Sequence, residues 1–524
     1  MAWGNPGSGS HSEVDGWIAR LKRRDPTFTS LHILSFRRLT TDNFVRLFEA
    51  IARNNTLTEL GCSGHQLDVR ALGALSDMLQ ANHTLRRLTF GSAHQFGEHP
   101  DHLAIVAEGL AANRGLQELD LEYKDLSLAH VSALRLILTR PAGWEVLKLG
   151  RNKLGDEAIA RLLGPILAAG SAAGPGTLVS RIADLDLTDN TIQAQGAADI
   201  ARWLTTPVPA TAAQSVSRLG SVKAFKLSYN PLGTEGMAHI TQALGSDNTT
   251  LERLWLIDCI QPDEGAATTA AAAELASVTT NSDGVSEVAA DTHAVLPWIE
   301  SLRTSLRRNT TLRGLWLHRC QLGDNGLVHL SQGLGRHAPK SRLATLSLRD
   351  NRITDTGVVA LAQALADDTV ATSSLTNSSN DDDDNTPSSV RKLDLSENRI
   401  SPAGLAHLLQ CPQLGELTLY ANQVAIAGPI PELSNGDNAG ALRRLDLSCN
   451  DIEIPGFEYF SRALSAGLLP ALEILEVAGN ASQDQQSAWD PLVDQLTEQR
   501  PTLKVYWKKY ESADNSEAWP SMPA

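Results

Sequence analysis

Aromatic residues, cysteines and basic charge are all scarce in this sequence. Aromatic residues make up only 5% of the 524 positions, so any core must be built mainly from aliphatic side chains. The five cysteines are an odd number at wide spacing, which excludes a disulfide framework and a CxxC metal pair. We therefore expect a reducing, cytoplasmic environment, and we expect neither a bound metal nor a cofactor.

The scarcity of basic charge limits the choice of partner. The chain carries 45 Lys and Arg residues against 60 Asp and Glu residues, a net charge of −15. A protein that binds nucleic acid or an anionic membrane needs a basic surface, so neither partner is expected. No run approaches the roughly 18 apolar residues of a membrane span, and residues 1–16 lack the apolar region of a secretory signal. These absences predict a large, soluble, acidic intracellular protein.

What the sequence does have is a repeat. The pattern L-x-x-L-x-L-x-x-N recurs along most of the chain, with clear copies in LKLGRN, LDLTDN, LSLRDN and LDLSEN. Most copies start about 28 residues apart, and longer intervals indicate insertions. Fourteen copies start at the following residues: Leu31, Leu57, Leu85, Leu116, Trp144, Ile182, Val222, Leu251, Leu312, Leu343, Val390, Leu414, Leu442 and Leu472.

Each repeat combines two periodicities. Apolar residues at positions four and six alternate with polar residues at five and seven, which is the period of a short strand. The second half has helical spacing, as where Leu327, Leu330 and Leu334 fall on one helix face. Helix starts are predicted at four N-cap residues: Asp156, Asp324, Asp355 and Ser401. One strand and one helix per repeat predict a parallel sheet in which stacked neighbours bury a shared core.

The segments LERLWLIDC and LRGLWLHRC resemble leucine-rich repeats of the ribonuclease-inhibitor-like class, and the resemblance extends from residue 31 to residue 480. The same class of repeat occurs in ribonuclease inhibitor and in NOD-like receptors. The resemblance implies an α/β leucine-rich repeat solenoid, a horseshoe with parallel strands on its concave face and helices on its convex face.

The ninth position of each repeat is expected to be structural, because a small polar side chain there can hydrogen-bond loop backbone that no strand satisfies. This role is predicted for Asn152, Asn190, Asn230, Cys259, Cys320, Asn351, Asn398, Asn422, Asn450 and Asn480. The first four repeats have Leu39, His65, Ala93 and Lys124 in that place, which predicts less regular turns.

The repeats define the expected organisation of the chain. Residues 1–30 are predicted to hold a disordered segment and a capping helix over 13–24, followed by a domain of about 14 repeats over 31–480. Residues 481–524 are predicted to hold a second cap and a loose tail, with a helix over 486–499 and a strand over 503–507. Three insertions are expected, over 204–219, 261–294 and 366–389. The last two should be mobile, because their composition cannot offset the entropy lost on ordering them.

Catalytic motifs are missing. The sequence contains no GxxxxGK[ST], HExxH, GxSxG or kinase HRD set, so no enzyme activity is expected. The acidic run Asp381–Asp384 is interpreted as a solvated loop, and the Asn248 and Asn309 sequons as unmodified turn residues. Cys62, Cys259 and Cys320 are predicted to be buried, so Cys411 or Cys449 should be alkylated first.

Function in such an array is expected at the strand positions that face solvent. Trp255 and Trp316 occupy position five of consecutive repeats, and their rings are expected in the concave face. Five further residues are predicted around them: Tyr229, Arg253, Arg313, His318 and Arg319. Clustered Trp, Tyr and Arg side chains are typical of a binding hot spot. In the alternative interpretation the two tryptophans are packing residues that stiffen the sheet.

Two functions remain open at this point. The first is a non-enzymatic scaffold, expected to be a monomer, that binds an unidentified protein through its concave face. The alternative is a GTPase-activating protein of the Ran GTPase-activating type, which shares the repeat class. That family has an acidic C-terminal tail, whereas the ESADNSEAWPSMPA segment here is only mildly acidic.

Overall fold

The computed structural model describes residues 9–169, 182–206, 222–246, 250–260, 295–338, 340–366, 390–426, 441–480 and 486–508. It divides into two compact units. Unit 1 comprises Met1–Leu232 with Ser246–Trp255, and unit 2 comprises Gly233–Gly245 with Leu256–Ala524. The predicted insertion over 261–294 and most of the other two insertions lie outside the described residues.

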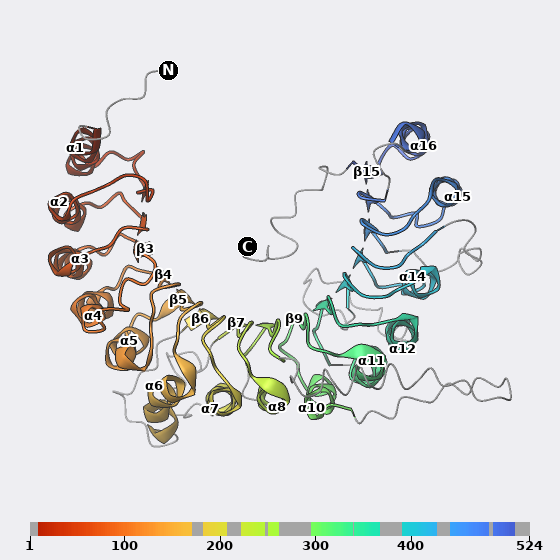
Figure 1. Cartoon of the computed structure of the whole chain (residues 1–524), viewed down its shortest axis with the longest axis horizontal. Helices are drawn as coiled ribbons and strands as arrows, with labels where there is room; N and C mark the ends of the chain where they lie inside the picture. The colour runs from red at the N-terminus through yellow and green to blue at the C-terminus, as the bar shows by residue number, and fades with distance from the viewer. Residues whose placement is uncertain are drawn as a thin grey trace, which may run out of the picture. The chain divides into compact units, whose positions relative to one another are not determined.

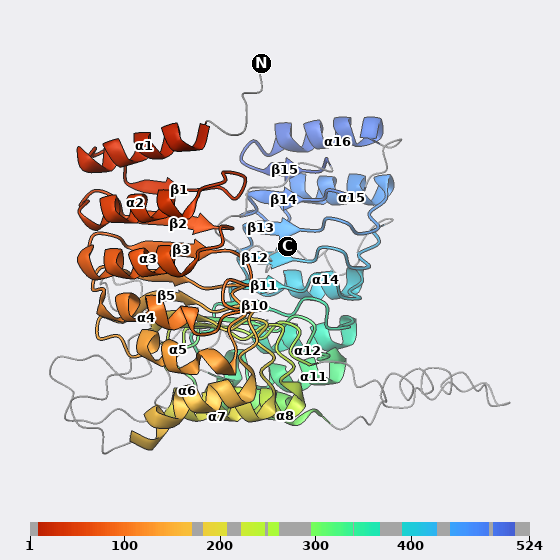
Figure 2. The ribbon, with the colours of Figure 1, turned by 60° about the vertical axis from the view of Figure 1, so that its left-hand side comes forward.

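Unit 1 stacks strand–helix repeats in chain order, with the strands in one layer and the helices in another (Figures 1 and 2). Its strands pair in parallel, each with the next. They are β1 Ser30–His32, β2 Glu59–Ser63, β3 Arg87–Gly91, β4 Glu118–Asp120, β5 Trp144–Lys148, β6 Ile182–Asp186, β7 Ala224–Lys226 and β8 Arg253–Trp255. The helices are α1 Gly9–Lys22, α2 Thr41–Ala52, α3 Val69–Ala81, α4 His102–Ala112, α5 Val131–Leu138, α6 Gly155–Ala169 and α7 Ala194–Thr205.

Unit 2 repeats the same arrangement (Figure 1). Its parallel strands are β9 Gly314–Trp316, β10 Thr345–Ser347, β11 Lys392–Asp394, β12 Glu416–Thr418, β13 Arg444–Asp446, β14 Ile474–Glu476 and β15 Lys504–Tyr506. Its helices are α8 Gly233–Ala243, α10 Pro297–Leu306, α11 Gly323–Ser331, α12 Asp355–Ala366, α14 Pro402–Leu409, α15 Ile454–Ser465 and α16 Gln486–Gln499. None of the helices described has the length and apolarity needed to cross a membrane.

The core of each unit lies between its strand and helix layers. At the centre of each strand one apolar residue pairs with its counterpart in the next repeat, as Leu346 does with Leu315 and Leu393. These three residues are fully buried, and so are leucines of the helix layer such as Leu327. The predicted α/β leucine-rich repeat solenoid is therefore confirmed in both units.

Buried asparagines at position nine connect successive repeats. Asn351 donates from Nδ2 to the carbonyl oxygens of Leu317 and Arg349, at 2.6 and 3.1 Å. Its Oδ1 accepts hydrogen bonds from the backbone of Cys320 at 2.9 Å and of Leu322 at 3.3 Å. Asn230 and Asn422 bridge to the preceding repeat in the same way. The side chain of Asn230 accepts from the backbone of Asn190 and donates to the carbonyl of Leu187, and that of Asn422 accepts from the backbone of Ile400 and donates to the carbonyl of Leu395. Each amide thus satisfies backbone groups that the short strands leave unpaired.

The early repeats replace asparagine with longer side chains. His65 lies 3.2 Å from the carbonyl oxygen of Leu34 through Nε2, and the Lys124 ammonium donates to the carbonyl of Gly91 at 3.1 Å. Near Ala93 the donor comes from Gln95, whose amide donates to the carbonyl of Leu67 at 2.7 Å. These three side chains perform the same backbone pairing by other routes.

The carboxylates of the three aspartates predicted as N-caps instead accept hydrogen bonds from the backbone of the following repeat. Asp324 lies inside the first turn of α11, and its Oδ1 accepts from the backbone nitrogens of Thr354 and Gly357, at 2.7 and 3.1 Å. A Cβ atom at Gly357 would come within 2.7 Å of that oxygen, so glycine is required for this close approach. The prediction of an own-helix cap is wrong for Asp156, Asp324 and Asp355, whereas Ser401 caps α14 as predicted.

Both predicted caps are present. The N-terminal helix covers Gly9–Lys22, so it begins inside the segment expected to be disordered. At the other end α16 has the predicted bounds, and β15 lies within the predicted strand over 503–507. The Asn309 sequon is part of the structure rather than a free turn: its side chain donates to the carbonyl of Leu244 at 2.7 Å and accepts from the backbone of Leu312 at 2.7 Å.

Candidate functional site

The strand face of unit 1 carries a row of alternating charge. The strand register places Asp120, Lys148, Asp186, Lys226 and Trp255 side by side on consecutive strands. The Lys226 ammonium lies 3.2 Å from a carboxylate oxygen of Asp186 and 5.8 Å from the centre of the Trp255 ring. Opposite charges on neighbouring strands stabilise the sheet, so this row largely satisfies itself.

Burial shifts the titration of this row. Burial and the carboxylate of Asp120 raise the pKa of Glu122 above its usual range. Burial lowers the pKa of Lys148, but the carboxylates of Asp120 and Glu118 outweigh it and raise that pKa overall. The row is therefore a set of interacting charges rather than independent surface groups.

The strand face of unit 2 has a different composition. Its corresponding row runs through Trp316, Ser347, Asp394, Thr418, Asp446, Glu476 and Tyr506. Asp446 and Glu476 are direct neighbours, and like charges placed directly opposite destabilise a sheet. Burial and the nearby Asp446 carboxylate raise the pKa of Glu476 to about 7, despite its ion pair with Arg444. This part of the sheet keeps acidic groups at a cost in stability.

Three groups in unit 2 resemble a catalytic triad but have the wrong proton arrangement. His318 Nε2 lies 2.6 Å from the hydroxyl oxygen of Ser347, and that hydroxyl donates to Asp394 at 2.7 Å. Because the serine proton points to Asp394, Nε2 of His318 must be the donor and cannot accept it. Ser347 is also fully buried, and burial lowers the pKa of His318 to about 4. The cluster is a hydrogen-bond relay that orders the sheet.

The two tryptophans are not exposed, which corrects the sequence-based expectation. Trp255 belongs to unit 1 and Trp316 to unit 2, and each is only 6% exposed. The Trp316 ring lies over Gly314, where an added Cβ would come within 2.6 Å of the ring. The missing side chain at Gly314 therefore lets the ring lie flat on the sheet. Their predicted role as partner anchors remains a prediction.

Position eight of the repeats provides the accessible side chains. We define the position-eight row as Tyr123, Arg151, Asp189 and Tyr229 in unit 1, and Asp258, Arg319, Asp350, Glu397, Ala421 and Cys449 in unit 2. All ten have φ between +51° and +60°. All are exposed or half-exposed. This left-handed residue directly precedes position nine, whose side chain points beneath the strand ends.

Several members of the position-eight row interact within their own unit. The Arg319 guanidinium donates to Asp350 at 2.9 Å and lies 3.9 Å from Asp258. The Arg319 and Asp350 side chains are 45% and 43% exposed. In unit 1 the Arg151 guanidinium lies 4.8 Å from the centre of the Tyr123 ring. In unit 1 the row thus presents aromatic rings and both signs of charge, and in unit 2 it presents both signs of charge.

The remaining residues of the predicted hot spot are divided among these surfaces. Tyr229 and Arg319 belong to the position-eight row, and His318 is buried in the relay. Arg253 and Arg313 are exposed, and Arg253 lies 5.9 Å from the Trp255 ring centre. The structure therefore does not bring the seven residues together as one exposed cluster. The left-handed backbone could not be predicted from the residue types, because Tyr, Arg, Asp and Glu all occur at position eight.

Burial, rather than position in the repeat, decides which of the five cysteine thiols is accessible to solvent. Cys62, Cys259, Cys320 and Cys411 are buried, and only Cys449 is exposed. Burial raises the pKa of Cys62 and of Cys411 to about 12. Of the two thiols expected to be alkylated first, Cys449 is the exposed one. Cys411 is only 4% exposed, and its sulfur lies against the backbone of α12 and α14.

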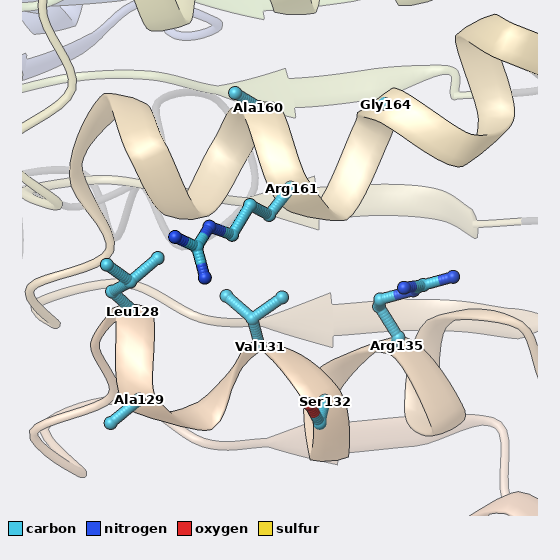
Figure 3. Close-up of a pocket in the computed structure, with 8 residues that line it drawn as sticks. All are labelled: Leu128, Ala129, Val131, Ser132, Arg135, Ala160, Arg161 and Gly164. Carbon is cyan, nitrogen blue, oxygen red and sulfur yellow. The ribbon is translucent and has the colours of Figure 1, made fainter.

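A shallow groove lies on the helix layer of unit 1. Its volume is about 750 Å³, and it opens between α5 and α6, where Val131, Arg135 and Arg161 line it (Figure 3). Arg161 is already in an ion pair with Glu157 of its own helix, at 2.5 Å. The groove is open to solvent along its length, and we assign no ligand to it.

Comparisons with known proteins agree with the repeat pattern. The leucine-rich repeat family model matches residues 343–362, 386–409 and 442–461. The chain is 28% identical over 336 residues to a ribonuclease inhibitor of Sus scrofa, covering 64% of this chain and 57% of that protein. It is 27% identical over 381 residues to a ribonuclease inhibitor of Mus musculus, covering 70% of this chain and 74% of that protein. A solved leucine-rich repeat-containing protein, LegL7 from Legionella pneumophila, matches with a TM-score of 0.38 at 16% identity, over 70% of this chain and 96% of that one.

Proposed function

We propose, from the premise that this chain is a leucine-rich repeat protein of the ribonuclease-inhibitor-like class, that it is a non-enzymatic scaffold for a partner protein. In each unit, the contact surface in this proposal is the position-eight row together with the strand face beside it. The partner-binding character of the repeat class supports the general function. Three properties support the choice of surface: its backbone conformation, its composition and the charge of the chain.

The backbone conformation of the position-eight row carries the proposal. A non-glycine residue in the left-handed region costs on the order of 1–3 kcal/mol, and glycine avoids most of that cost. Gly479 has φ +76° at the same place after β14, so the fold accepts glycine there. Tyr123, Tyr229 and Arg319 nevertheless occupy it, in a conformation that large residues rarely adopt. Side chains kept at such a cost indicate a function beyond the fold.

The composition of the row suits protein recognition. Tyrosine and arginine are enriched among residues that dominate binding energy. In this row they are held on a rigid base, because the buried side chain of the next position hydrogen-bonds the backbone of the preceding repeat. That side chain is Lys124 after Tyr123, Asn152 after Arg151, Asn230 after Tyr229 and Cys320 after Arg319. A preordered surface loses little conformational freedom on binding, which favours affinity.

The charge of the chain favours a basic partner. The net charge is −15, and the strand face of unit 2 carries Asp394 and Asp446 in one row, whereas the neighbouring Glu476 is paired with Arg444. Such a field increases the association rate of a cationic protein. Two relatives are named ribonuclease inhibitors, so a basic ribonuclease is the first partner to test.

The test is a titration of the full chain with a basic pancreatic-type ribonuclease, monitored by calorimetry and by loss of ribonuclease activity. We expect Tyr229→Ala and Glu397→Ala each to weaken binding by about tenfold or more, the scale of an important interface residue. The matched control is Glu458→Ala, an exposed carboxylate on α15, which should leave affinity within about twofold.

A second arm covers a partner other than a ribonuclease. Wild-type chain and a combined Tyr229→Ala/Glu397→Ala variant are used as bait in parallel, with quantitative mass spectrometry of the retained proteins. The proposal predicts a protein that the wild type and Glu458→Ala retain and that the combined variant loses. Equal retention by all three chains would contradict the position-eight row as the contact surface.

A further inference from the structure

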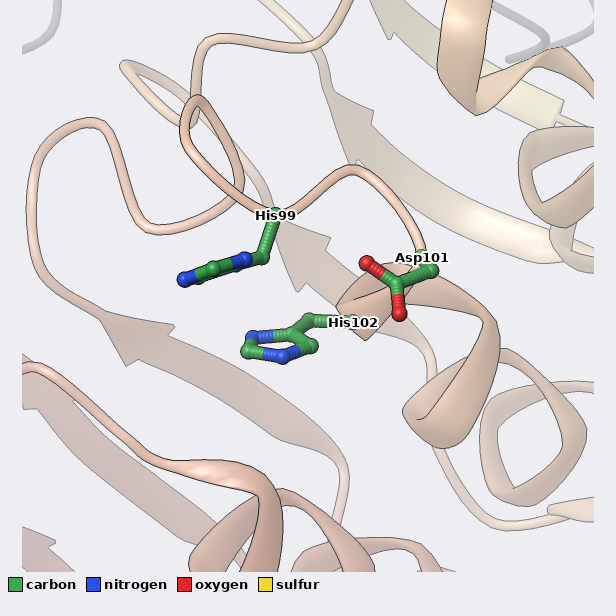
Figure 4. Close-up of side chains that lie close together, drawn as sticks. All are labelled: His99, Asp101 and His102. Atoms are coloured by element: carbon green, nitrogen blue, oxygen red, sulfur yellow. The ribbon is translucent and has the colours of Figure 1, made fainter.

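The loop that joins β3 to α4 in unit 1 brings two imidazoles and a carboxylate together. His99, Asp101 and His102 each offer a ligand atom, and these atoms all lie within 4.8 Å of one another. The two rings are stacked with centroids 4.6 Å apart and planes 28° apart, and the Asp101 carboxylate lies beside them (Figure 4). We propose that this cluster binds a divalent transition-metal ion, with Zn²⁺ as the reference ion.

The donor set fits that class of ion. Two imidazole nitrogens and one carboxylate oxygen are ligands that Zn²⁺ accepts in proteins, whereas Mg²⁺ and Ca²⁺ prefer all-oxygen sites. Three protein ligands leave a fourth tetrahedral position for water or for a group of another molecule. Rotation of these partly or fully exposed side chains about their χ angles would bring the ligand atoms, now within 4.8 Å of one another, to metal-binding distances.

The conformation of Asp101 is the second observation that supports the site. Asp101 is the N-cap residue of α4, yet its side chain makes no capping hydrogen bond. Its backbone is helical, with φ −67° and ψ −21°. By contrast Asp68 at the N-cap of α3 is extended and accepts from the backbone of Ala71 at 2.9 Å. The Asp101 carboxylate is therefore released from the usual role of an N-cap residue and is directed to the histidines.

The loop backbone holds the three ligands in place. The backbone nitrogen of His102 donates to the carbonyl of His99 at 3.1 Å, and that of Ala104 donates to the carbonyl of Asp101 at 3.0 Å. Pro100 between the ligands restricts the backbone further. In the part of the chain that the structure describes, no side-chain hydrogen bond or ion pair engages the three ligands. A metal ion would therefore displace no hydrogen bond or ion pair of these three side chains.

This inference replaces the sequence-based expectation that no metal site is present. The spacing H-x-D-H is short and common, and the sequence alone could not show that the capping role of Asp101 is vacant. The nearby His94 provides an internal comparison, because it is engaged with Asp125 at 2.7 Å and lies outside the cluster.

The test is calorimetric titration of the full chain, freed of its affinity tag and of chelator, with ZnCl₂ at neutral pH. We expect about one equivalent bound with a dissociation constant in the micromolar range or below, and a higher melting temperature with Zn²⁺. His99→Ala/His102→Ala should abolish this binding, and Asp101→Asn should weaken it about tenfold or more. His94→Ala is the matched control and should bind as the wild type does.

Further readouts separate binding from a folding defect. Circular dichroism of the apo variants should match the wild type, since the substituted side chains are partly or fully exposed. Binding should weaken on acidification, because a ligating imidazole must lose its proton, and millimolar Mg²⁺ should not compete. Absence of binding at 100-fold excess Zn²⁺, or equal affinity in the double histidine variant, would overturn the proposal.

Discussion

His318 shows how burial decides the state of a single residue. It is 9% exposed, and burial lowers its pKa to about 4, although the Asp394 carboxylate opposes this shift. In the unfolded chain a histidine titrates near 6.5. Between these two values the unfolded state binds more protons than the folded state, so stability should increase with pH from about 4 to 6.5. Glu476 acts in the opposite sense. Its pKa is higher in the folded state than in the unfolded state, so its contribution to stability decreases as the pH rises from about 4.5 to 7.

The prediction at this scale is a change in the slope of stability against pH. Urea unfolding between pH 4.5 and 6.5 should show a shallower increase in stability for His318→Gln, whose amide can still donate to Ser347. Glu476→Gln should show a steeper increase than the wild type. If the two variants and the wild type have the same slope, the buried state assigned to these groups is wrong.

The cysteines give a second prediction at the residue scale. Because only Cys449 is exposed, native protein should react quickly with iodoacetamide at one site, read by peptide mass spectrometry. Cys449→Ser should leave the native chain almost unreactive, and guanidinium should restore labelling of the other four. Early labelling of Cys320 in native protein would contradict the burial of position nine.

At the scale of an element, the asparagine of position nine stabilises the turn. Asn351 makes four hydrogen bonds to buried backbone groups. Removing it leaves those groups unsatisfied, at about 1–3 kcal/mol for each one that water cannot reach. We expect Asn351→Ala to lower the free energy of unfolding by about 3 kcal/mol or more.

The measurement is chemical denaturation of the full chain, with two comparisons. Asn480→Ala should lower the free energy of unfolding by less than Asn351→Ala does, because the Asn480 side chain is only half-buried. Gln332→Ala, an exposed residue after α11, should change stability by no more than about 0.5 kcal/mol. A cost for Asn351→Ala as small as that of Gln332→Ala would contradict the role assigned to the asparagines.

The burial of Trp316 leads to a separate prediction for its strand. Truncating a buried aromatic side chain typically costs about 3–5 kcal/mol. Trp316→Ala should therefore lower the melting temperature clearly while leaving partner affinity close to that of the wild type once the variant is folded. A stable Trp316→Ala variant with weakened binding would restore the hot-spot interpretation of this residue.

The elements could be predicted because their signals are periodic. Alternating apolar residues mark the strands, helical spacing marks the helices, and Asn at position nine marks the turn. The candidate site was less accessible to sequence reasoning. Position five faces away from the core, and that placement predicts exposure. Trp316 is nevertheless buried because its ring lies flat over Gly314, a contact between residues of one strand face. The replacement of asparagine by Gln95 likewise depends on a side chain that reaches from its own repeat to the backbone of the preceding one.

At the scale of the whole molecule, the distribution of charge matters more than its sum. The strand face of unit 1 alternates Asp120, Lys148, Asp186 and Lys226, whereas the corresponding row in unit 2 is acidic. The net charge of −15 alone does not show this difference. Beside each face, the accessible side chains are those of the position-eight row, and in our proposal they contact the partner protein.

The most direct measurement of that claim is site-specific photo-crosslinking. A photoreactive amino acid is placed at Tyr229, at Glu397 or, as the helix-layer control, at Glu458, and each chain is irradiated with its partner. If the position-eight row is the contact surface, we expect crosslinks to the partner from Tyr229 and Glu397 and none from Glu458. Crosslinks only from Glu458, with Tyr229 and Glu397 silent, would contradict it.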